Sequence, residues 1–249
     1  MSGHEVKTTY KTIIPQIVLM MSNTNSPEKD IVIPLFPLPT TVFYPNTSLP
    51  LHIFEPRYRN MVADALQGEG EIGMVLLKSG RGVDYHGVPE IMTIGCVGKI
   101  EHHSQLPKGK YNILLSGLHR FRIIHEIEGK LYRQAQVEIL EEINDKDLAA
   151  GNLPIKQRLI ENMGQYLKNM PSREEVEKSL NLENCAKLAE LVDKIFYHFD
   201  LPTSKMQEFL EEQDVQKRSE SLHALIELKT QLIQISKNMR AGGVDFSMN

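Results

Sequence analysis

The metal-binding and acid–base side chains of this chain are scattered along the sequence. His102 and His103 are adjacent, and neighbouring side chains on an extended backbone point in opposite directions, so a metal would need distant further ligands. His125 precedes Glu126 and Glu128 without the second histidine of a zinc motif. Neither H-E-x-x-H nor paired C-x-x-C occurs. We therefore predict no metal and no cofactor, with His102 and His103 in a solvated loop and His125 near a charged hairpin.

Motifs for phosphate binding and for nucleophilic catalysis are also absent from the sequence. The nearest approach to a P-loop is G-C-V-G-K-I at residues 95–100, which has the wrong spacing and lacks the hydroxyl that holds Mg²⁺. Ser116 and Gly117 stand together without the rest of G-x-S-x-G. We predict no catalytic residue and no enzymatic activity. An enzyme would need a cleft of perturbed acids or histidines, which the sequence does not indicate.

Composition is that of an ordinary globular protein. The 249 residues are 41% hydrophobic and 24% charged, which allows one large domain or two small ones. The net charge of −4 argues against a protein built mainly to hold nucleic acid, because phosphate binding needs concentrated Lys and Arg. Cys96 and Cys185 are far apart, so we expect no disulfide framework, a reducing compartment and a cytoplasmic location. Neither nucleic acid nor a membrane is an expected partner.

Prolines concentrate in residues 31–66, among aliphatic and aromatic side chains. Because proline donates no hydrogen bond, this segment cannot be a central strand along its whole length, and we expect edge strand, bulge and rigid turn. Residues 49–53 alternate as a short strand does. Pro56 is suited to the first turn of a helix, with Glu55 placing a carboxylate at its positive end. One face of that helix is apolar, and it carries Tyr58, Met61, Val62, Ala65 and Leu66.

Further short apolar segments with frequent turn signals extend to residue 139. Gly95 and Gly98 suggest bends that would curl a sheet. These features predict a strongly bent sheet or a partly closed barrel. The expected strands are residues 72–77, 91–100, 111–116, 118–124 and 134–139.

The remainder of the chain has helical periodicity. The last helix, about residues 215–238, carries apolar residues over more than one stripe. Either this helix is wedged between two packed layers, or part of its surface meets a partner. The expected units are a disordered tail at residues 1–30, with Met21 a candidate start of translation, a β-rich domain at 31–143, a helical bundle at 147–238 and a flexible tail at 239–249.

Four motifs, taken in order, resemble a known family. They are I-P-L-F-P-L-P at residues 33–39, P-L-H-I-F-E-P-R-Y at 50–58, G-M-V-L-L at 73–77 and G-K-Y-N-I-L-L-S-G-L-H-R-F-R-I at 109–123. Their order and spacing resemble the amino-terminal substrate-binding domain of Lon protease, over about residues 31–235, and the unit is similar to the Lon-like region of cereblon. The resemblance implies an α+β fold, in which a PUA-like bent sheet or pseudo-barrel precedes a helical bundle.

The resemblance also implies a function. Lon protease couples an ATPase to a Ser–Lys peptidase, and this sequence carries neither set of motifs nor the zinc ligands of cereblon-like extensions. We therefore expect a free-standing, non-catalytic module that binds unfolded or exposed apolar polypeptide segments and acts as an adaptor or regulator of proteolysis in protein quality control. A Lon-type protease is a candidate partner. The alternative is a PUA-like protein that binds RNA or a small molecule, although a shared fold is only an analogy.

Two sets of residues follow from this interpretation. An apolar groove beside the proline-rich edge is expected to bind polypeptide, although each of its residues has a place in the core as its alternative: Phe36, Phe43, Tyr44, Phe54 and Met74. Glu55 and Arg57 are expected to cap the helix and to tie it to neighbouring backbone. Arg120 and Arg122 are expected to pair with acidic residues across strands, the alternative being a basic stripe. The family-motif residues with structural roles are Pro37, Pro50, Glu55, Pro56, Arg57, Tyr58, Gly117, Arg120 and Phe121.

Overall fold

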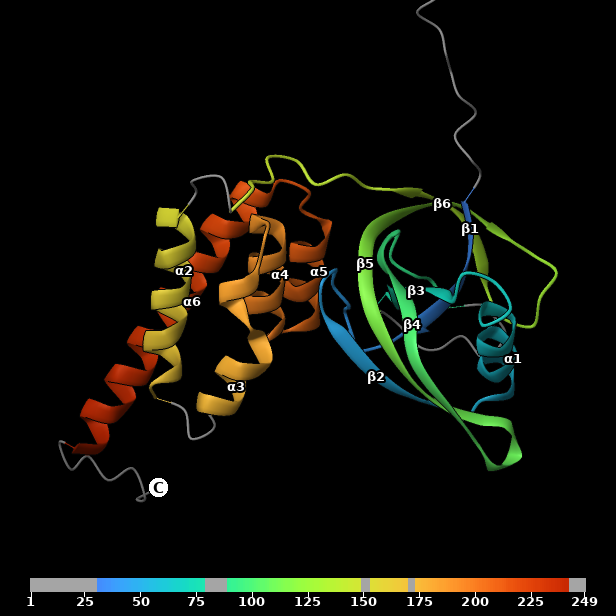
Figure 1. Ribbon diagram of the computed structural model, residues 1–249, viewed down its shortest axis with the longest axis horizontal. Coiled ribbons are helices and arrows are strands. Elements are labelled where there is room, and N and C mark those ends of the chain that lie inside the picture. Colours follow the sequence, from blue (N-terminus) through green and yellow to red (C-terminus); the bar gives the residue numbers. More distant parts are fainter. Residues whose placement is uncertain (1–30, 79–88, 149–152, 170–172, 242–249) are drawn as a thin grey trace, which may run out of the picture. The chain divides into compact units, whose positions relative to one another are not determined.

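The computed structural model describes residues 31–78, 89–148, 153–169 and 173–241, in which a sheet precedes a group of helices (Figure 1). The strands are β1 (Ile31–Leu38), β2 (Ser48–Ile53), β3 (Glu71–Leu76), β4 (Ile94–Leu106), β5 (Lys110–Ile127) and β6 (Gln134–Ile139). The helices are α1 (Pro56–Ala65), α2 (Leu153–Leu167), α3 (Arg173–Leu180), α4 (Leu188–Tyr197), α5 (Thr203–Glu211) and α6 (Val215–Ala241), with short 3-10 turns η2 (Pro107–Gly109) and η3 (Leu182–Asn184). The predicted α+β class with a long last helix is confirmed.

The predicted ends of the chain fall mostly outside this description. The tail at residues 1–30, with the candidate start at Met21, lies outside the described residues, and so do residues 242–249. The helix α6 continues to Ala241, so the first residues assigned to a flexible tail after 238 are helical.

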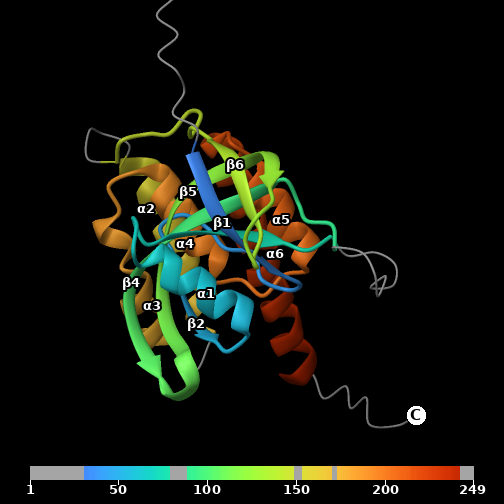
Figure 2. The ribbon, with the colours of Figure 1, turned by 90° about the vertical axis from the view of Figure 1, so that its right-hand side faces the viewer.

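The sheet closes on itself, as the predicted bent sheet or partly closed barrel requires. Its strand order is β2-β5-β4-β3-β1-β6, and β6 also pairs with β5. Figure 2 shows β1 and β6 beside each other, where the ring is completed. The strand β5, expected as two strands about Gly117, is continuous: its first part pairs with β2 and its later part with β6.

The strand β1 shows how the ring accommodates prolines. Residues 31–34 pair antiparallel with β6, and residues 35–38 pair parallel with β3. Each half of the strand is therefore paired mainly on one side, so Pro34 and Pro37 can occupy positions where a missing N–H costs no ladder hydrogen bond. β1 is thus edge-like along each half although it lies between two strands of the ring.

Two apolar clusters hold the fold together. The smaller one takes residues from β1, β3, β4, β5 and β6, and it therefore fills the inside of the ring; Phe121 is fully buried there. The larger one lies on the other face, where α1 and the later helices pack. Tyr44 belongs to it: its ring lies 5.8 Å from that of Phe196 and its hydroxyl donates to the carbonyl of Met206 at 2.5 Å. Sheet and helices thus share one core.

Gly117 is required where β5 passes the segment before β2. A Cβ atom built at Gly117 would lie 2.0 Å from the carbonyl oxygen of Tyr44, a distance that no side chain tolerates. The Gly117 N–H donates to the carbonyl of Thr47 at 2.8 Å, and its carbonyl accepts from the N–H of Asn46 at 2.9 Å. Glycine therefore allows two backbone segments to touch at this point.

Candidate polypeptide-binding surface

The five residues predicted to bind polypeptide do not lie on one surface. Phe36, Phe43, Tyr44 and Met74 are buried in the larger cluster, which was the alternative placement for each. Phe54 follows β2 and is 58% exposed. A binding role for these residues stays a prediction, and Phe54 is the one whose ring is presented to solvent.

The strand β2, which leads to Phe54, lies at the end of the sheet order. It pairs with β5 along its whole length, and no other strand of the described chain pairs with it. Pro50 lies in the middle of β2, a residue that is tolerated where the backbone N–H points away from the neighbouring strand. Along its opposite edge, the backbone groups of β2 have no partner strand among the described residues.

One face of β2 is also exposed. Ser48, Pro50 and His52 alternate with Leu49, Leu51 and Ile53, which are more buried. The rings of His52 and Phe54 are stacked, with centroids 6.1 Å apart and 25° between their planes, and the Nδ1 atom of His52 lies 2.7 Å from the Oδ1 atom of Asn112 on β5. Pro50, His52 and Phe54 thus form a short row of partly apolar side chains along the open edge, which we call the β2 row.

The residues after the β2 row begin α1. Pro56 occupies the first turn, as predicted. Glu55 is the N-cap residue but makes no capping hydrogen bond through its side chain, so the capping role predicted for Glu55 and Arg57 is wrong in this respect. Instead, Arg57 Nε donates to Glu55 Oε2 at 3.0 Å, and the Arg57 guanidinium lies 4.6 Å from the ring centre of Tyr58. Glu55 and Arg57 thus form an exposed ion pair at the start of α1.

Arg120 lies on the face of β5 opposite to Phe121 and is buried against the helices. Its Nη1 and Nη2 atoms donate to Asp193 Oδ2 at 2.9 Å and Oδ1 at 2.8 Å, and Nη1 also donates to Glu142 Oε1 at 2.6 Å. The backbone carbonyl of Leu210 accepts from Arg120 Nε at 3.0 Å. Burial, the largest influence, opposes the charge of Arg120, but the attraction and hydrogen bonds of Asp193 together with the attraction of Glu142 outweigh it and raise the pKa of the guanidinium above its usual value.

A second arginine completes this buried cluster. Arg218 of α6 donates through Nη2 to Glu142 Oε2 at 2.7 Å, and its Nε lies 3.6 Å from Asp193 Oδ1. Two arginines and two carboxylates therefore balance in charge, and they connect β5 to α4 and α6. The expected cross-strand pairing holds for Arg122, which meets Glu138 of β6 at 2.9 Å, whereas the acidic partners of Arg120 are Glu142, which follows β6, and Asp193 of α4.

Sequence reasoning missed Asp193 and Arg218. A signal was present at Asp193, because it interrupts the apolar side of α4 between Val192 and Ile195, where a solvated aspartate is out of place. A buried carboxylate implies a buried cation nearby. The sequence alone does not show that Arg120 and Arg218 supply it.

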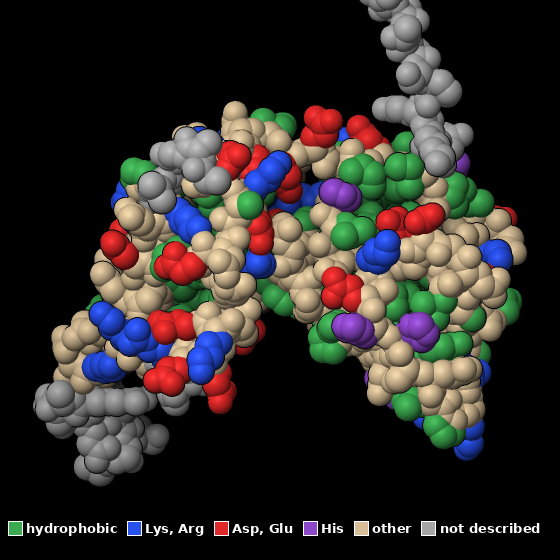
Figure 3. Space-filling view, in the orientation of Figure 1, with side chains coloured by type: hydrophobic (Ala, Val, Ile, Leu, Met, Phe, Trp, Pro, Cys, Tyr) green, Lys and Arg blue, Asp and Glu red, His purple; other side chains and the backbone are tan. Residues whose placement is uncertain are grey.

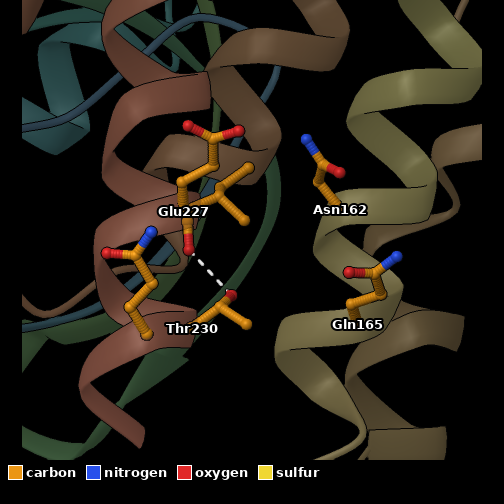
Figure 4. Close-up of a pocket in the computed structure, with 6 residues that line it drawn as sticks. Asn162, Gln165, Glu227 and Thr230 are labelled. Carbon is orange, nitrogen blue, oxygen red and sulfur yellow. Dashed lines mark hydrogen bonds between the residues drawn. The ribbon is translucent and has the colours of Figure 1, made fainter. Parts of the chain in front are cut away.

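The helical part and its junction with the sheet contain several hollows. Figure 4 shows one between α2 and α6, with a volume of about 260 Å³, where Asn162 and Gln165 face Glu227 and Thr230. Asn162 is held by His223, its Nδ2 atom lying 2.8 Å from His223 Nδ1. Another, of about 510 Å³, lies beside Arg120 and contains Glu142, Asp145 and Lys187. The first is lined mainly by polar side chains, whereas Leu118, Ile139 and Leu140 also line the second.

Within the described residues, no group of three histidine, cysteine or acidic side chains is arranged to hold a metal ion. His102 and His103, expected in a loop, lie exposed on β4, and His125 lies on β5. Cys96 and Cys185 are free and buried, and burial raises the pKa of Cys185 to about 11. Over the same part of the chain, no helix combines the length and apolar character needed to cross a membrane.

Comparison with known proteins shows which family this chain resembles. Residues 32–227 match the family model described as the ATP-dependent protease La (LON) substrate-binding domain. The chain is 30% identical over 221 residues to the Lon protease of Escherichia coli (strain K12), covering 86% of this chain and 27% of the relative. It is 28% identical over 210 residues to the Lon protease of Dictyoglomus thermophilum, covering 84% and 26%. The chain thus spans about a quarter of the length of these relatives.

Solved structures show the same fold. The N-terminal domain of the Mycobacterium avium complex Lon protease matches with a TM-score of 0.59 at 18% identity, over 79% of this chain and 98% of that one. The Lon N-terminal domain protein from Xanthomonas campestris matches with a TM-score of 0.55 at 22% identity, over 78% and 98%. The structures share the fold, and by the match of residues 32–227 to the family model the chain belongs to the Lon substrate-binding domain family.

Proposed function

We propose that this chain is a non-catalytic module that binds extended, exposed apolar segments of unfolded polypeptides. The observation that carries the proposal is the open edge of β2, bordered by the exposed row of Pro50, His52 and Phe54. Family membership supports polypeptide as the ligand class.

The expected mode of binding is addition of a strand to β2. Because alternate residues of a strand point their backbone groups the same way, the N–H of His52 and the carbonyls of Pro50 and His52 would face the incoming segment. Pro50 removes one donor, so hydrogen bonds alone give little affinity. Contacts of side chains with the rings of His52 and Phe54 supply the rest, and they favour apolar segments.

We further propose that the chain acts in the cytoplasm as an adaptor or regulator that presents bound segments to a Lon-type protease. The names of its relatives support a place in proteolysis. The sequence contains no P-loop, and we expect the purified chain to hydrolyse neither ATP nor peptide bonds.

RNA binding, the alternative function, gains little support from charge. On the face drawn in Figure 3, Lys and Arg side chains are interspersed with Asp and Glu. The net charge is −4, whereas general affinity for a phosphate backbone needs a basic surface.

A backbone-modified peptide tests the proposed mode. The probe is a labelled peptide of about eight residues, the length of a typical strand, with alternating valine and threonine. Two further versions carry N-methyl groups on one or the other set of alternate amides. We expect one methylated set to abolish binding, because its amides face β2, and the other to leave binding intact. Equal binding by both methylated peptides would exclude strand addition.

Substitution of the β2 row tests the site. Phe54→Ala should weaken peptide binding, whereas Leu131→Ala, at another exposed apolar residue, should not. Equal affinities of the two variants would place the binding site elsewhere.

A further inference from the structure

A hollow of about 510 Å³ lies where β5 passes from one strand partner to the next. Along one edge β5 pairs with β4, and along the other it pairs with β2 up to Ser116 and with β6 from Phe121 onward (Figure 1). Leu118 and His119 lie between these two pairings, and both line the hollow. The sheet therefore leaves a gap at this point, which the segment after β6 and the start of α4 border. We call this space the β5 hollow.

The lining of the β5 hollow is both apolar and charged. The strands and the residues that adjoin them contribute apolar side chains, which are Pro45, Leu118, Ile139 and Leu140. The segment after β6 and the start of α4 contribute charged ones, which are Glu141, Glu142, Asp145, Lys187 and Glu190. Apolar walls with a few polar groups, at the junction of two parts of a fold, are typical of small-ligand sites, which measure about 300–1,000 Å³.

The acidic side chains of the lining have basic partners in every case but one. The balanced sets are Arg120 and Arg218 with Glu142 and Asp193, Lys187 with Asp145, and Lys194 with Glu190. Glu141 also lines the hollow, and no basic side chain of the described ranges pairs with it. A single bound cation would therefore make the charges around the hollow equal in number.

An anion would find few free donors here, although the start of a helix commonly attracts one. The N–H of Leu188 donates to the carbonyl of Lys146 at 2.9 Å, and the N–H of Ala189 donates to Asp145 Oδ1 at 2.9 Å. The guanidinium of Arg120 is engaged in the buried cluster. The first donors of α4 and the buried arginine are thus already used.

A cation, by contrast, finds free acceptor positions. Each oxygen of Glu142 accepts one hydrogen bond from an arginine, and this side chain is 25% exposed. Because a carboxylate oxygen has two lone-pair sites, each of these oxygens keeps one. Within the described chain, Asp145 Oδ2 has only a contact of 3.7 Å with Lys187 Nζ, and the Lys187 side chain is 69% exposed. Donors brought by a ligand therefore meet acceptors on two carboxylates.

We propose that the β5 hollow binds a guanidinium or ammonium group carried on an aliphatic stem, as in the side chains of arginine and lysine. The charged group donates to Glu142 and Asp145, and the stem packs against the apolar part of the lining. A guanidinium is the better fit, because it carries five donors and is more weakly hydrated than an ammonium. The source is a basic side chain of a polypeptide or a free compound of the same form.

Methyl NMR of the full chain tests the site with a capped arginine, N-acetyl-arginine methylamide. We expect this compound to shift the methyl signals of Leu118, Ile139 and Leu140, with a dissociation constant of about 1 mM, which is usual for so small a ligand. Capped citrulline has the same shape without the charge, and it should bind about tenfold more weakly because charge-assisted hydrogen bonds are lost. Equal binding of the two compounds, or no shift of these methyl signals, would overturn the proposal.

Two matched variants test the carboxylate. Asp145→Asn removes the charge but still offers an oxygen to the N–H of Ala189, so the start of α4 should keep its cap. This variant should bind capped arginine about fivefold more weakly. Glu138→Gln removes an acidic side chain of the same sheet that lies outside the lining, and it should bind like the wild type. Unchanged affinity in Asp145→Asn, with an unchanged melting temperature, would contradict the assignment.

Two further titrations identify the source of the cation and separate this site from the β2 row. A glycine–serine peptide with one central arginine that binds as tightly as the capped arginine identifies a polypeptide side chain as the source, whereas exclusion of this peptide identifies a free compound. Phe54→Ala should bind capped arginine like the wild type, because Phe54 lies beyond the far end of β2. A loss of affinity in Phe54→Ala would place the cation at the β2 row instead. Failure of capped arginine to bind leaves the proposed binding of apolar segments at β2 unaffected.

Discussion

Arg120 of β5 and Asp193 of α4 form a two-point ion pair at the junction of the sheet and the helices. Two guanidinium nitrogens donate to the two carboxylate oxygens at 2.9 and 2.8 Å, and the side chains are 1% and 0% exposed. Such a pair is costly to desolvate, so its partners depend on each other. The pair therefore ties β5 to α4, and removal of either partner would leave an uncompensated buried charge.

Breaking this pair should strongly destabilise the protein. Asp193→Ala leaves Arg120 and Arg218 buried with one carboxylate between them, and we expect a loss of about 3–5 kcal/mol in the free energy of unfolding. Glu138→Ala removes the exposed partner of Arg122 on the same strand and should cost about 0–1 kcal/mol. Urea unfolding of both variants measures the difference. Equal, small losses would mean that Arg120 reaches solvent when Asp193 is removed.

Alanine substitutions at Gly117 and Gly164 provide a second test with a matched control. Gly117→Ala forces a methyl group against the carbonyl of Tyr44, and the resulting backbone shift should cost at least about 1–3 kcal/mol. Gly164→Ala lies in α2, where a Cβ atom meets nothing within 4 Å, and should stabilise the helix by about 0.5–1 kcal/mol. Thermal melting of the two variants should shift in opposite directions. An unchanged melting temperature for Gly117→Ala would show that the contact between β5 and the backbone of Tyr44 is looser than described.

Stability should fall in mildly acidic solution through His198. Burial lowers the pKa of His198 below its usual value of 6.5, so the unfolded chain takes up the proton first. The contribution of the neutral side chain is thus fully present above pH 6.5 and is lost as pH falls from there through the lower pKa of the folded state. Urea unfolding at steps across this window should show a smaller pH dependence for His198→Gln. The same slope in both proteins would assign the effect to other groups.

We propose that the sheet unit at residues 31–143 and the helical unit at 147–238 stay joined in solution. Tyr44 bonds to Met206, and Arg120 reaches α4 and the end of α5, so the connection cannot open without breaking buried contacts. Limited proteolysis should cut in the amino-terminal tail before it cuts near Asp145. Early release of two folded halves by a cut near Asp145 would show that these contacts are weak.

Local patterns predict much of this fold. The prolines before residue 57, the glycines of the curled strands and the helical periodicity after residue 150 gave the element types in the correct order. The closure of the ring was harder to predict, because β1 pairs with β6 in one half and β3 in the other, and no local pattern encodes that exchange.

The candidate site was predicted less well. Phe43 and Phe54 are both aromatic residues near prolines, but one is buried beneath the sheet and the other is exposed after its edge strand. Residue type does not separate these cases, since burial depends on which face later elements cover. For α6 the sequence left two alternatives, and the exposure of Leu228 and Leu232 shows that the described residues do not cover the helix on both faces.

Titration of an unfolded protein tests the central claim most directly. The probe is a reduced, carboxymethylated and fluorescently labelled globular protein, added at about 50 mM and about 500 mM salt, which spans strong and weak screening. We expect a dissociation constant of the order of micromolar, since a few buried side chains supply the affinity after ordering costs. It should be nearly equal at both salt concentrations and weaker for Phe54→Ala, with no binding of the same protein in its folded form. Equal binding of the folded and unfolded probe, or tight binding of single-stranded RNA that collapses with salt, would contradict the account.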